Sequence, residues 1–566
     1  MKRREFLRLS IQTAAAATTS NFIINEAQAI TKSSYAAIFP LLDQFIQQYL
    51  KDMNAPGLTL TLVDASGIQR VCTFGVEDSV KRSAIKPNKL FHIGSITKSF
   101  LGLCLMQLHD EGKLDLDRPI AEYLPWVRFD STTRSISTHD LLTHSAALPD
   151  GELFPTDPSF RHHATAAPGT FFHYCNMGYD ALGLLLETLD QRPLAESFRV
   201  RILNPVGMKS TEPIITLDMA NRVVNSYMVE LNDRPYPRAG RLVAAPPIAV
   251  TTASGCIASN AVDMGAYLQM LINRGQVPTG RLVSEAGFKL FSTPHAEADE
   301  FGKGAKYGYG ITVDTLDGHT RLRHTGGMVS FASALEVDLD AGLGVFVSVN
   351  SMQGYRPRPV AEYALRLMRA SREGKPLPKI PLQKPSDYVD KASDYEGRFS
   401  GADGRILEIT SVGDRLYLIH RGTQVTLEPT IGAENSFTVL HPEFAKFAVH
   451  FKRDGDKKEG KFAEVGWGND WYVSADYTGA REFSVPSEWH SYVGHYRNDS
   501  DWIGSMHVVL RAGILWLDGV IPLEPTPDHR FFLRDEMDSP EWISFSEMVN
   551  GHPMRMKLSG KDLARV

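Results

Sequence analysis

The chain has 566 residues, with 60 lysines and arginines against 66 aspartates and glutamates and a formal net charge of −6 at pH 7. This length is too great for a single domain and indicates about three. The balanced charge gives no reason to expect nucleic acid or an anionic membrane as a partner. Beyond residue 29 the sequence has no apolar run of about 18 residues, so we expect no membrane span.

Residues 1–29 have the features of a bacterial export signal. The adjacent Arg3 and Arg4 are followed by Phe6-Leu7, an alanine-rich stretch and the small-x-small cleavage pattern Ala27-Gln28-Ala29. This order is typical of a twin-arginine signal, which carries proteins that have already folded. We therefore expect a periplasmic or secreted protein.

Hydrophobic spacing after the signal predicts a helix over residues 35–53, then a β-hairpin, and then a buried helix that begins at Ser95. Residues 115–300 have mainly helical and loop patterns. Strand patterns return over 308–313, 332–337 and 344–349, and a helix follows from Pro359. Strands at both ends with helices between them predict an α+β domain, residues 30–372, with an antiparallel sheet, flanking helices and a helical insertion.

A proline-rich linker, residues 373–386, ends this domain. The chain beyond it is rich in strand patterns and repeats itself at an offset of about 97 residues. The two copies predict small all-β barrel-like domains over 387–484 and 485–566. The matching segments are Tyr395–Phe399 with Tyr492–Tyr496, Leu416–Leu418 with Leu515–Leu517, and Leu427–Thr430 with Leu523–Thr526.

The pattern Ser-x-x-Lys occurs twice, at Ser83/Lys86 and at Ser95/Lys98. Pro87 follows the first copy and disfavours helical geometry at Lys86, so we expect an exposed loop there. In the second copy the spacing places both side chains on one face of the first helical turn. A serine hydroxyl is a weak nucleophile, and a desolvated lysine beside it can take its proton. We predict that Ser95 is a nucleophile and Lys98 its base.

A second motif, Tyr174-x-Asn176, supplies partners for this pair. A phenol close to a lysine ammonium ionises more easily, so Tyr174 is expected to accept the serine proton and return it to the leaving group. The amide of Asn176 can hold the lysine or a substrate amide. The same spacing at Tyr496/Asn498 lies in the second β-repeat, where we expect a structural role.

The third motif is His324-Thr325-Gly326-Gly327, between two predicted strands. Glycines at a strand edge allow the backbone of a substrate to lie alongside. We expect the amide of Gly327 to pair with that of Ser95 as an oxyanion hole.

The three motifs, in this order, resemble those of the serine β-lactamase and penicillin-binding protein superfamily. The resemblance covers roughly residues 35–372. It is nearest to the class C β-lactamase-like branch, which includes D-aminopeptidases, DD-carboxypeptidases and esterases. The segments that carry this finer resemblance are Glu111–Asp117, Leu141–Ser145 and Pro168-Gly169.

The resemblance implies acyl transfer through a covalent ester on Ser95, with Lys98 and Tyr174 sharing the base role and Asn176 orienting Lys98 and the substrate. The two β-domains are similar in layout to those of D-aminopeptidases, whose accessory barrels lean over the cleft. We therefore expect one of them to contribute a loop to the cleft.

His324 departs from the family pattern, because β-lactamases carry a lysine at this place. A histidine is mostly neutral near pH 7 and gives no permanent cation for a substrate carboxylate. We expect it to hydrogen-bond Tyr174 or the substrate. The departure favours hydrolysis of a peptide or amide bond, as in D-aminopeptidases or oligopeptide-degrading enzymes. A carboxylesterase or a β-lactamase is the alternative within the superfamily. A penicillin-recognising or peptide-binding protein that does not turn over is the alternative of another class.

No metal or cofactor is expected. The four cysteines are scattered and predict buried free thiols. His162, His163 and His173 lack the spacing of zinc ligands and are expected to be solvated loop residues. The predicted partner is a small peptide or ester substrate, and the sequence leaves the oligomeric state open.

Overall fold

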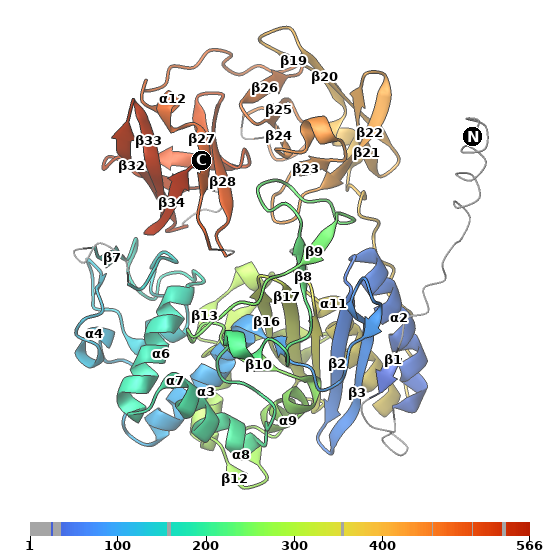
Figure 1. Cartoon of the computed structure of the whole chain (residues 1–566), viewed down its shortest axis with the longest axis vertical. Helices are drawn as coiled ribbons and strands as arrows, with labels where there is room; N and C mark the ends of the chain where they lie inside the picture. The colour runs from blue at the N-terminus through green and yellow to red at the C-terminus, as the bar shows by residue number, and fades with distance from the viewer. Residues whose placement is uncertain are drawn as a thin grey trace, which may run out of the picture.

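The computed structural model describes residues 24–26, 35–154, 160–352, 356–455, 457–500, 502–534 and 539–566. An α+β domain lies in the lower half of Figure 1, and two β-barrels stand above it. Most of the predicted export signal lies outside the described residues. The exception is strand β1 (Ile24–Glu26), whose backbone pairs with β3.

An antiparallel sheet of ten strands forms the centre of the α+β domain, in the order β1-β3-β2-β18-β17-β16-β15-β14-β13, with β4 beside β3. Strands β2 and β18 are neighbours, with Leu60 opposite Val347. Both ends of the domain therefore complete one sheet, as the sequence predicts. The bounds are β2 Gly57–Asp64, β3 Gly67–Asp78, β4 Ser83–Ala84, β13 Ala296–Glu297, β14 Lys306–Tyr307, β15 Thr312–Leu316, β16 His319–Met328, β17 Phe331–Asp338 and β18 Leu343–Val349.

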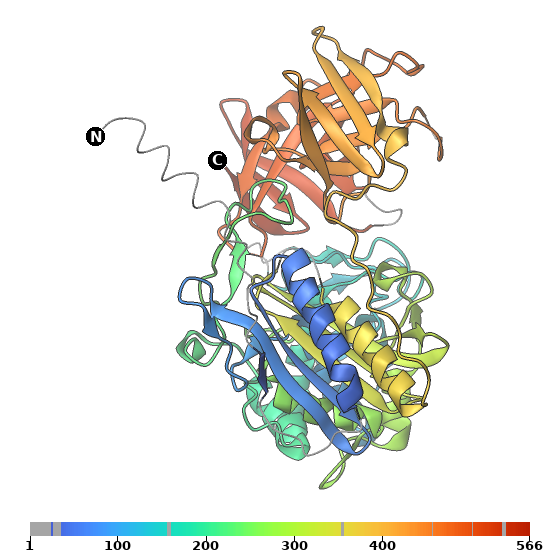
Figure 2. The same ribbon diagram turned by 90° about the vertical axis from the view of Figure 1, so that its right-hand side faces the viewer.

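Two long helices, α2 (Phe39–Asp52) and α11 (Arg358–Arg372), lie side by side on one face of this sheet (Figure 2). Their apolar sides meet at Phe45 and Tyr363, whose rings pack edge to face with centroids 5.0 Å apart. Strands β2 and β18 are buried along almost their whole length, because helices cover the sheet on both faces.

The other face carries the helical insertion, with α3 (Thr97–Asp110) at its centre. Every residue from Thr97 to Met106 is buried, which confirms the predicted buried helix. Burial on all sides explains why its apolar residues do not gather on a single face. The helices around it are α4 Ile120–Tyr123, α5 Thr138–Leu142, α6 Asn176–Asp190, α7 Leu194–Phe198, α8 Asn204–Val206, α9 Ala261–Ile272 and α10 Glu285–Ser292.

The strand predicted over residues 308–313 is wrong at its start, since β15 begins only at Thr312. The preceding residues bend around Gly310, which has a φ of +84°. A Cβ at Gly310 would lie 2.3 Å from the carbonyl oxygen of Lys98. The bend therefore brings the chain against the first turn of α3, an approach that only glycine permits.

The two C-terminal units are closed eight-stranded barrels, which confirms the predicted fold class. The repeated segments fall on equivalent strands: the first, third and fourth of each barrel. Phe399 and Tyr496, which match in the repeat, are both fully buried in their cores. The hydroxyl of Tyr496 donates to the carbonyl of Tyr492 at 2.8 Å, a structural role. The strands are β19 Gly397–Gly401, β20 Ile406–Val412, β21 Arg415–His420, β22 Thr423–Pro429, β23 Ser436–Val439, β24 Val449–Lys452, β25 Glu464–Trp467 and β26 Asp470–Val473 in the first barrel, and β27 Gly494–Arg497, β28 Ser505–Arg511, β29 Ile514–Leu517, β30 Ile521–Pro525, β31 Phe531–Leu533, β32 Trp542–Val549, β33 His552–Leu558 and β34 Lys561–Arg565 in the second.

An arm of the α+β domain reaches up to the barrels. It is built on strands β8 (Tyr227–Val229) and β9 (Leu242–Ala244), and its tip rises above the sheet in Figure 1. Within the arm, the backbone amide of Arg238 donates a hydrogen bond to Glu428 of the first barrel. The arm thus ties the first barrel to the domain that carries the three motifs.

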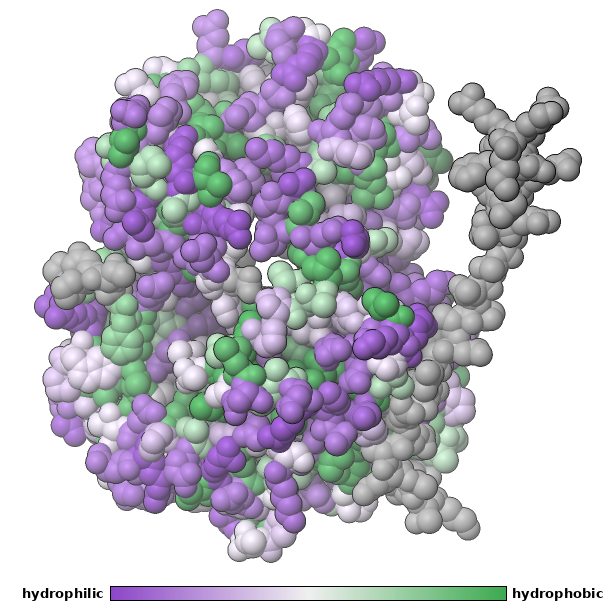
Figure 3. All heavy atoms as spheres, in the orientation of Figure 1, coloured by the Kyte–Doolittle hydropathy of each residue, from purple (hydrophilic) through white to green (hydrophobic). Residues whose placement is uncertain are grey.

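Hydrophilic side chains cover most of the face seen in Figure 3, and apolar ones are scattered among them. Within the part of the chain that the structure describes, no helix is both long and apolar enough to cross a bilayer. All four cysteines are buried thiols, as predicted.

Candidate active site

Ser95 lies in a short 3-10 turn, η2 (Gly94–Ile96), that leads directly into α3. Gly94 takes a φ of +53°, which lets the chain turn sharply before the serine. Ser95 is half-buried, while Lys98, on the next turn, has no exposure to solvent. The competing pair does not form such a site: Ser83 belongs to the short strand β4 rather than to the expected exposed loop, and Lys86 is exposed.

The ammonium group of Lys98 is surrounded by acceptors. Its Nζ is 3.3 Å from Ser95 Oγ and donates to Asn176 Oδ1 and to the carbonyl oxygen of Ser254, each at 2.8 Å. Burial lowers the pKa of Lys98 to about 8, although the nearby carboxylate of Asp180 raises it in part. A lysine with this pKa loses its proton within the physiological range and can act as a base.

Tyr174 lies beside both Ser95 and Lys98. Its hydroxyl hydrogen-bonds Ser95, and the Lys98 ammonium lies 4.8 Å from the centre of its ring. We expected the phenol to ionise more easily beside this cation. Instead, burial raises the pKa of Tyr174 well above its ordinary value, and the hydrogen bond from Ser95 offsets this only in part. Tyr174 therefore stays protonated at neutral pH and is not the base of the resting site.

Asn176 begins helix α6 and connects Lys98 to an acidic residue that no motif pointed to. Its Oδ1 accepts from Lys98, and its Nδ2 donates to Asp150 Oδ2 at 3.0 Å. Asp150 Oδ1 also accepts from the backbone amide of Met177 at 3.0 Å. Because its Nδ2 donates to Asp150, the oxygen of the Asn176 amide must face the lysine.

The third motif does not lie between two strands as predicted but inside the continuous strand β16. Its glycines press against the nucleophile turn. A Cβ at Gly326 would lie 1.8 Å from the carbonyl oxygen of Ile93, and one at Gly94 would lie 2.9 Å from the amide nitrogen of Gly327. The backbones of the two segments are therefore in contact, with the amide of Gly327 next to the turn that holds Ser95.

His324 does not bond Tyr174. Its Nε2 lies 2.9 Å from the hydroxyl of Tyr307, and its Nδ1 lies 2.7 Å from the carbonyl oxygen of Thr325. Burial, together with the charge of Lys98, lowers the pKa of His324 to about 3. The imidazole is neutral at any physiological pH.

A different cation lies beside the strand. The guanidinium of Arg356 is so near that a Cβ at Gly327 would be 2.4 Å from one of its nitrogens. Nothing in the sequence pointed to this arginine, which lies outside the three motifs just before α11. Only the tertiary fold places it next to Gly327.

Sequence reasoning also missed the aromatic support of Tyr174. The ring of His144 packs against that of Tyr174 with centroids 4.3 Å apart, and its Nδ1 accepts from the amide of Cys175 at 3.0 Å. His144 lies in Leu141–Ser145, a segment that carries the family resemblance but predicts no role for this histidine. The prediction for the other histidines is wrong in part: His162 is buried, and His173 is bonded to the second barrel.

Comparisons with known proteins identify the family of this chain. The chain belongs to the Beta-lactamase family, which it matches over residues 42–369. This confirms the predicted superfamily of serine β-lactamases and penicillin-binding proteins, whose members are serine hydrolases.

The sequence relatives are distant. Penicillin-binding protein 4 of Amycolatopsis lactamdurans is 26% identical over 255 residues, which are 42% of this chain and 65% of that protein. Protein flp of Staphylococcus aureus strain MW2 is 26% identical over 188 residues, or 30% of this chain and 37% of that protein. The similarity thus spans only part of either relative.

Among solved structures, the octameric penicillin-binding protein homologue from Pyrococcus abyssi has a TM-score of 0.54 and 25% sequence identity, and covers 76% of this chain and 99% of its own. The hydrolase EstCE1 has a TM-score of 0.50 and 17% identity, and covers 60% of this chain and 99% of its own, a likeness in fold alone.

The contact between β16 and the nucleophile turn generates a prediction. Gly326→Ala should lower the rate of reaction at Ser95 by about 100-fold or more, because the new Cβ collides with the Ile93 carbonyl and displaces the serine. Labelling of Ser95 by a fluorophosphonate measures this. Gly255→Ala is the matched control, since the nearest atoms to its Cβ lie at an ordinary 3.7 Å. Equal labelling of both variants would contradict the assigned contact.

The buried lysine generates a second prediction. The neutral amine is the form that accepts a proton, so the rate of Ser95 labelling should rise with pH through about 8 and level off above it. Asp180→Asn removes a negative charge that raises the pKa of Lys98, so the midpoint should move to lower pH. Asp110→Asn, about 18 Å along the same helix, should leave it unchanged. An unchanged midpoint in Asp180→Asn would refute this role of Lys98.

Proposed function

We propose that this protein is a serine hydrolase that forms an acyl-enzyme on Ser95 and hydrolyses a peptide or amide bond, in the manner of D-aminopeptidases or oligopeptide-degrading enzymes. The observation that carries the proposal is Lys98, which is fully buried with its amine 3.3 Å from the hydroxyl of Ser95 and a pKa lowered to about 8. An amine so placed is suited to activate the serine.

Acylation begins when Ser95 Oγ bonds to the substrate carbonyl carbon and its proton passes to Lys98. The amides of Ser95 and Gly327 would stabilise the oxyanion. The C–N bond then breaks, and the leaving amine takes a proton from Tyr174, which regains one from Lys98. Tyr174 carries its proton at neutral pH, as a donor must, and the lowered pKa of Lys98 supports its role as the base.

Deacylation reverses these transfers. A water molecule adds to the ester carbonyl and gives up a proton to Lys98. The bond to Ser95 Oγ then breaks, and the serine recovers its proton as the carboxylic acid product leaves. Asn176 would keep Lys98 in place through both halves of the cycle, since its Oδ1 holds the amine at 2.8 Å.

A second candidate function rests on Arg356. His324 is neutral and gives no cation, but the guanidinium of Arg356 lies against Gly327, where a substrate backbone would run. A permanent cation at this place favours substrates with a carboxylate, such as a β-lactam or the C-terminus of a peptide. The similarity to a penicillin-binding protein agrees with this candidate.

A substrate panel distinguishes these functions. We expect the purified protein to hydrolyse L- or D-aminoacyl anilides faster than a chromogenic cephalosporin or a short-chain nitrophenyl ester, because the site offers no lysine in the third motif. Ser95→Ala should lose all activity, since it lacks the nucleophile. Initial rates on each substrate are the measurement.

Full activity of Ser95→Ala would disprove the mechanism. Preference for the cephalosporin, together with its loss in Arg356→Met, would favour the second candidate. Stoichiometric labelling of Ser95 without turnover on any substrate would favour a penicillin-recognising or peptide-binding protein.

We also propose export through the twin-arginine signal in residues 1–29. The conservative double change Arg3→Lys and Arg4→Lys keeps the charge but removes the recognised pair. It should leave the protein in the cytoplasm of a bacterial host, as measured by fractionation and immunoblotting. Unchanged export would refute the proposed signal.

A further inference from the structure

The second barrel contacts a loop of the α+β domain that is bonded to the candidate active site. This loop, residues 149–151, follows α5 and carries Asp150. The carboxylate of Asp150 fixes Asn176 on one side, as described above. The backbone amide of Asp150, on its other side, donates a hydrogen bond across the domain boundary to Glu541 Oε1 at 2.7 Å.

Glu541 makes more than this one contact. The same Oε1 lies 2.9 Å from His173 Nε2, next to Tyr174 in the chain. Its Oε2 accepts from the hydroxyl of Ser559 within the barrel. Burial opposes the charge on Glu541, but these hydrogen bonds outweigh it and hold the pKa of the carboxyl below its ordinary value. The pKa of His173 is raised, because its bond to Glu541 outweighs the cost of burial.

The barrel also approaches the loop closely. A Cβ at Gly151 would lie 2.4 Å from the carbonyl oxygen of Ser559, so the two backbones touch. The ammonium of Lys561 lies 3.8 Å from Asp150 Oδ2. Three residues of the barrel therefore contact the loop, and one of them also reaches the segment that carries Tyr174.

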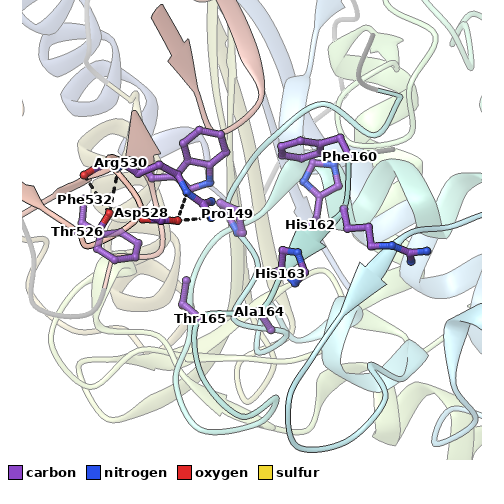
Figure 4. A pocket seen from close by; sticks show the side chains of 12 residues that line it. Pro149, Phe160, His162, His163, Ala164, Thr165, Thr526, Asp528, Arg530 and Phe532 are labelled. Carbon is purple, nitrogen blue, oxygen red and sulfur yellow. Dashed lines mark hydrogen bonds and ion pairs between the residues drawn. The ribbon is translucent and has the colours of Figure 1, made fainter. Parts of the chain in front are cut away.

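Next to these contacts the two domains do not pack tightly. A cavity of about 210 Å³ separates them, with Phe160, His162 and Pro149 on one side and Arg530 and Phe532 of the barrel on the other (Figure 4). Pro149 lines this cavity directly before Asp150. At this edge the polar contacts of Glu541 connect the barrel to the loop.

We infer that Glu541 is a positioning residue for the reaction at Ser95. It fixes the loop through the amide of Asp150 and fixes His173 beside Tyr174, and it acts on Lys98 through Asp150 and Asn176. The second barrel is thus a working part of the active site rather than an appended module. This inference rests on the proposed function, since it assigns a role in that same reaction.

Removal of Glu541 should affect both the rate and its pH dependence. Glu541→Ala and Glu541→Gln should slow labelling of Ser95 by a fluorophosphonate about 10- to 100-fold, because Lys98 and Tyr174 lose their fixed geometry. The nearby carboxylate of Asp150 raises the pKa of Lys98, so a displaced loop should also move the midpoint of the pH profile to lower pH. A purely structural defect would lower the amount of folded protein without moving this midpoint.

Glu428→Gln in the first barrel is the matched control. It alters a buried glutamate that, like Glu541, accepts a hydrogen bond from the α+β domain, but through the arm at Arg238. Its labelling rate and midpoint should equal those of the unaltered protein. Where Glu541→Ala does not fold, His173→Phe removes one bond to Glu541 from the opposite side and should slow labelling too.

The inference is overturned if folded Glu541 variants label Ser95 at the unaltered rate with the unaltered midpoint. An unaltered protein whose Ser95 is not labelled at all would instead overturn the proposed function, and this inference with it. The two failures are therefore distinguishable in one experiment.

Discussion

The complete burial of Lys98 is the constraint on which this active site depends. Taking an ammonium group out of water costs several kcal/mol unless polar partners replace the lost hydration. Asn176 and the carbonyl of Ser254 supply that replacement, and Asp180 holds the amide of Ser254 in place at 3.0 Å. The solvation is good enough to keep the lysine buried but incomplete, so its pKa falls to about 8. The incomplete solvation is what makes the amine a usable base.

Close contact between backbones is the second constraint. Glycines at 94, 310 and 326 let three segments meet around the first turns of α3, and almost any side chain there would collide with main-chain atoms. Main-chain atoms cannot move aside as the end of a flexible side chain can. The positions of Ser95 and of the Gly327 amide are therefore fixed by the packing of a strand against a helix, which is more rigid than a loop.

The barrels extend this arrangement in two ways. The first barrel contacts the arm at Arg238, away from the three motifs, and the second contacts the loop that carries Asp150. Both are closed, so neither presents a free strand edge to other proteins. The two copies have the same architecture but contact different parts of the α+β domain, which is consistent with their divergence in sequence.

The sequence by itself determined the superfamily, the sheet completed from both ends of its domain, the buried α3 helix and the duplicated barrels, because each leaves a local pattern of spacing or repetition. It also picked out Ser95, Lys98, Tyr174, Asn176 and His324, which the fold brings together. Tertiary structure alone decided the bonds between them. Burial makes Tyr174 a weak acid, and His324 hydrogen-bonds Tyr307. The fold also places Arg356 next to Gly327, and Glu541 of the second barrel bonds the amide of Asp150. Solvation and long-range contacts depend on residues distant in the chain, so no local pattern carries them.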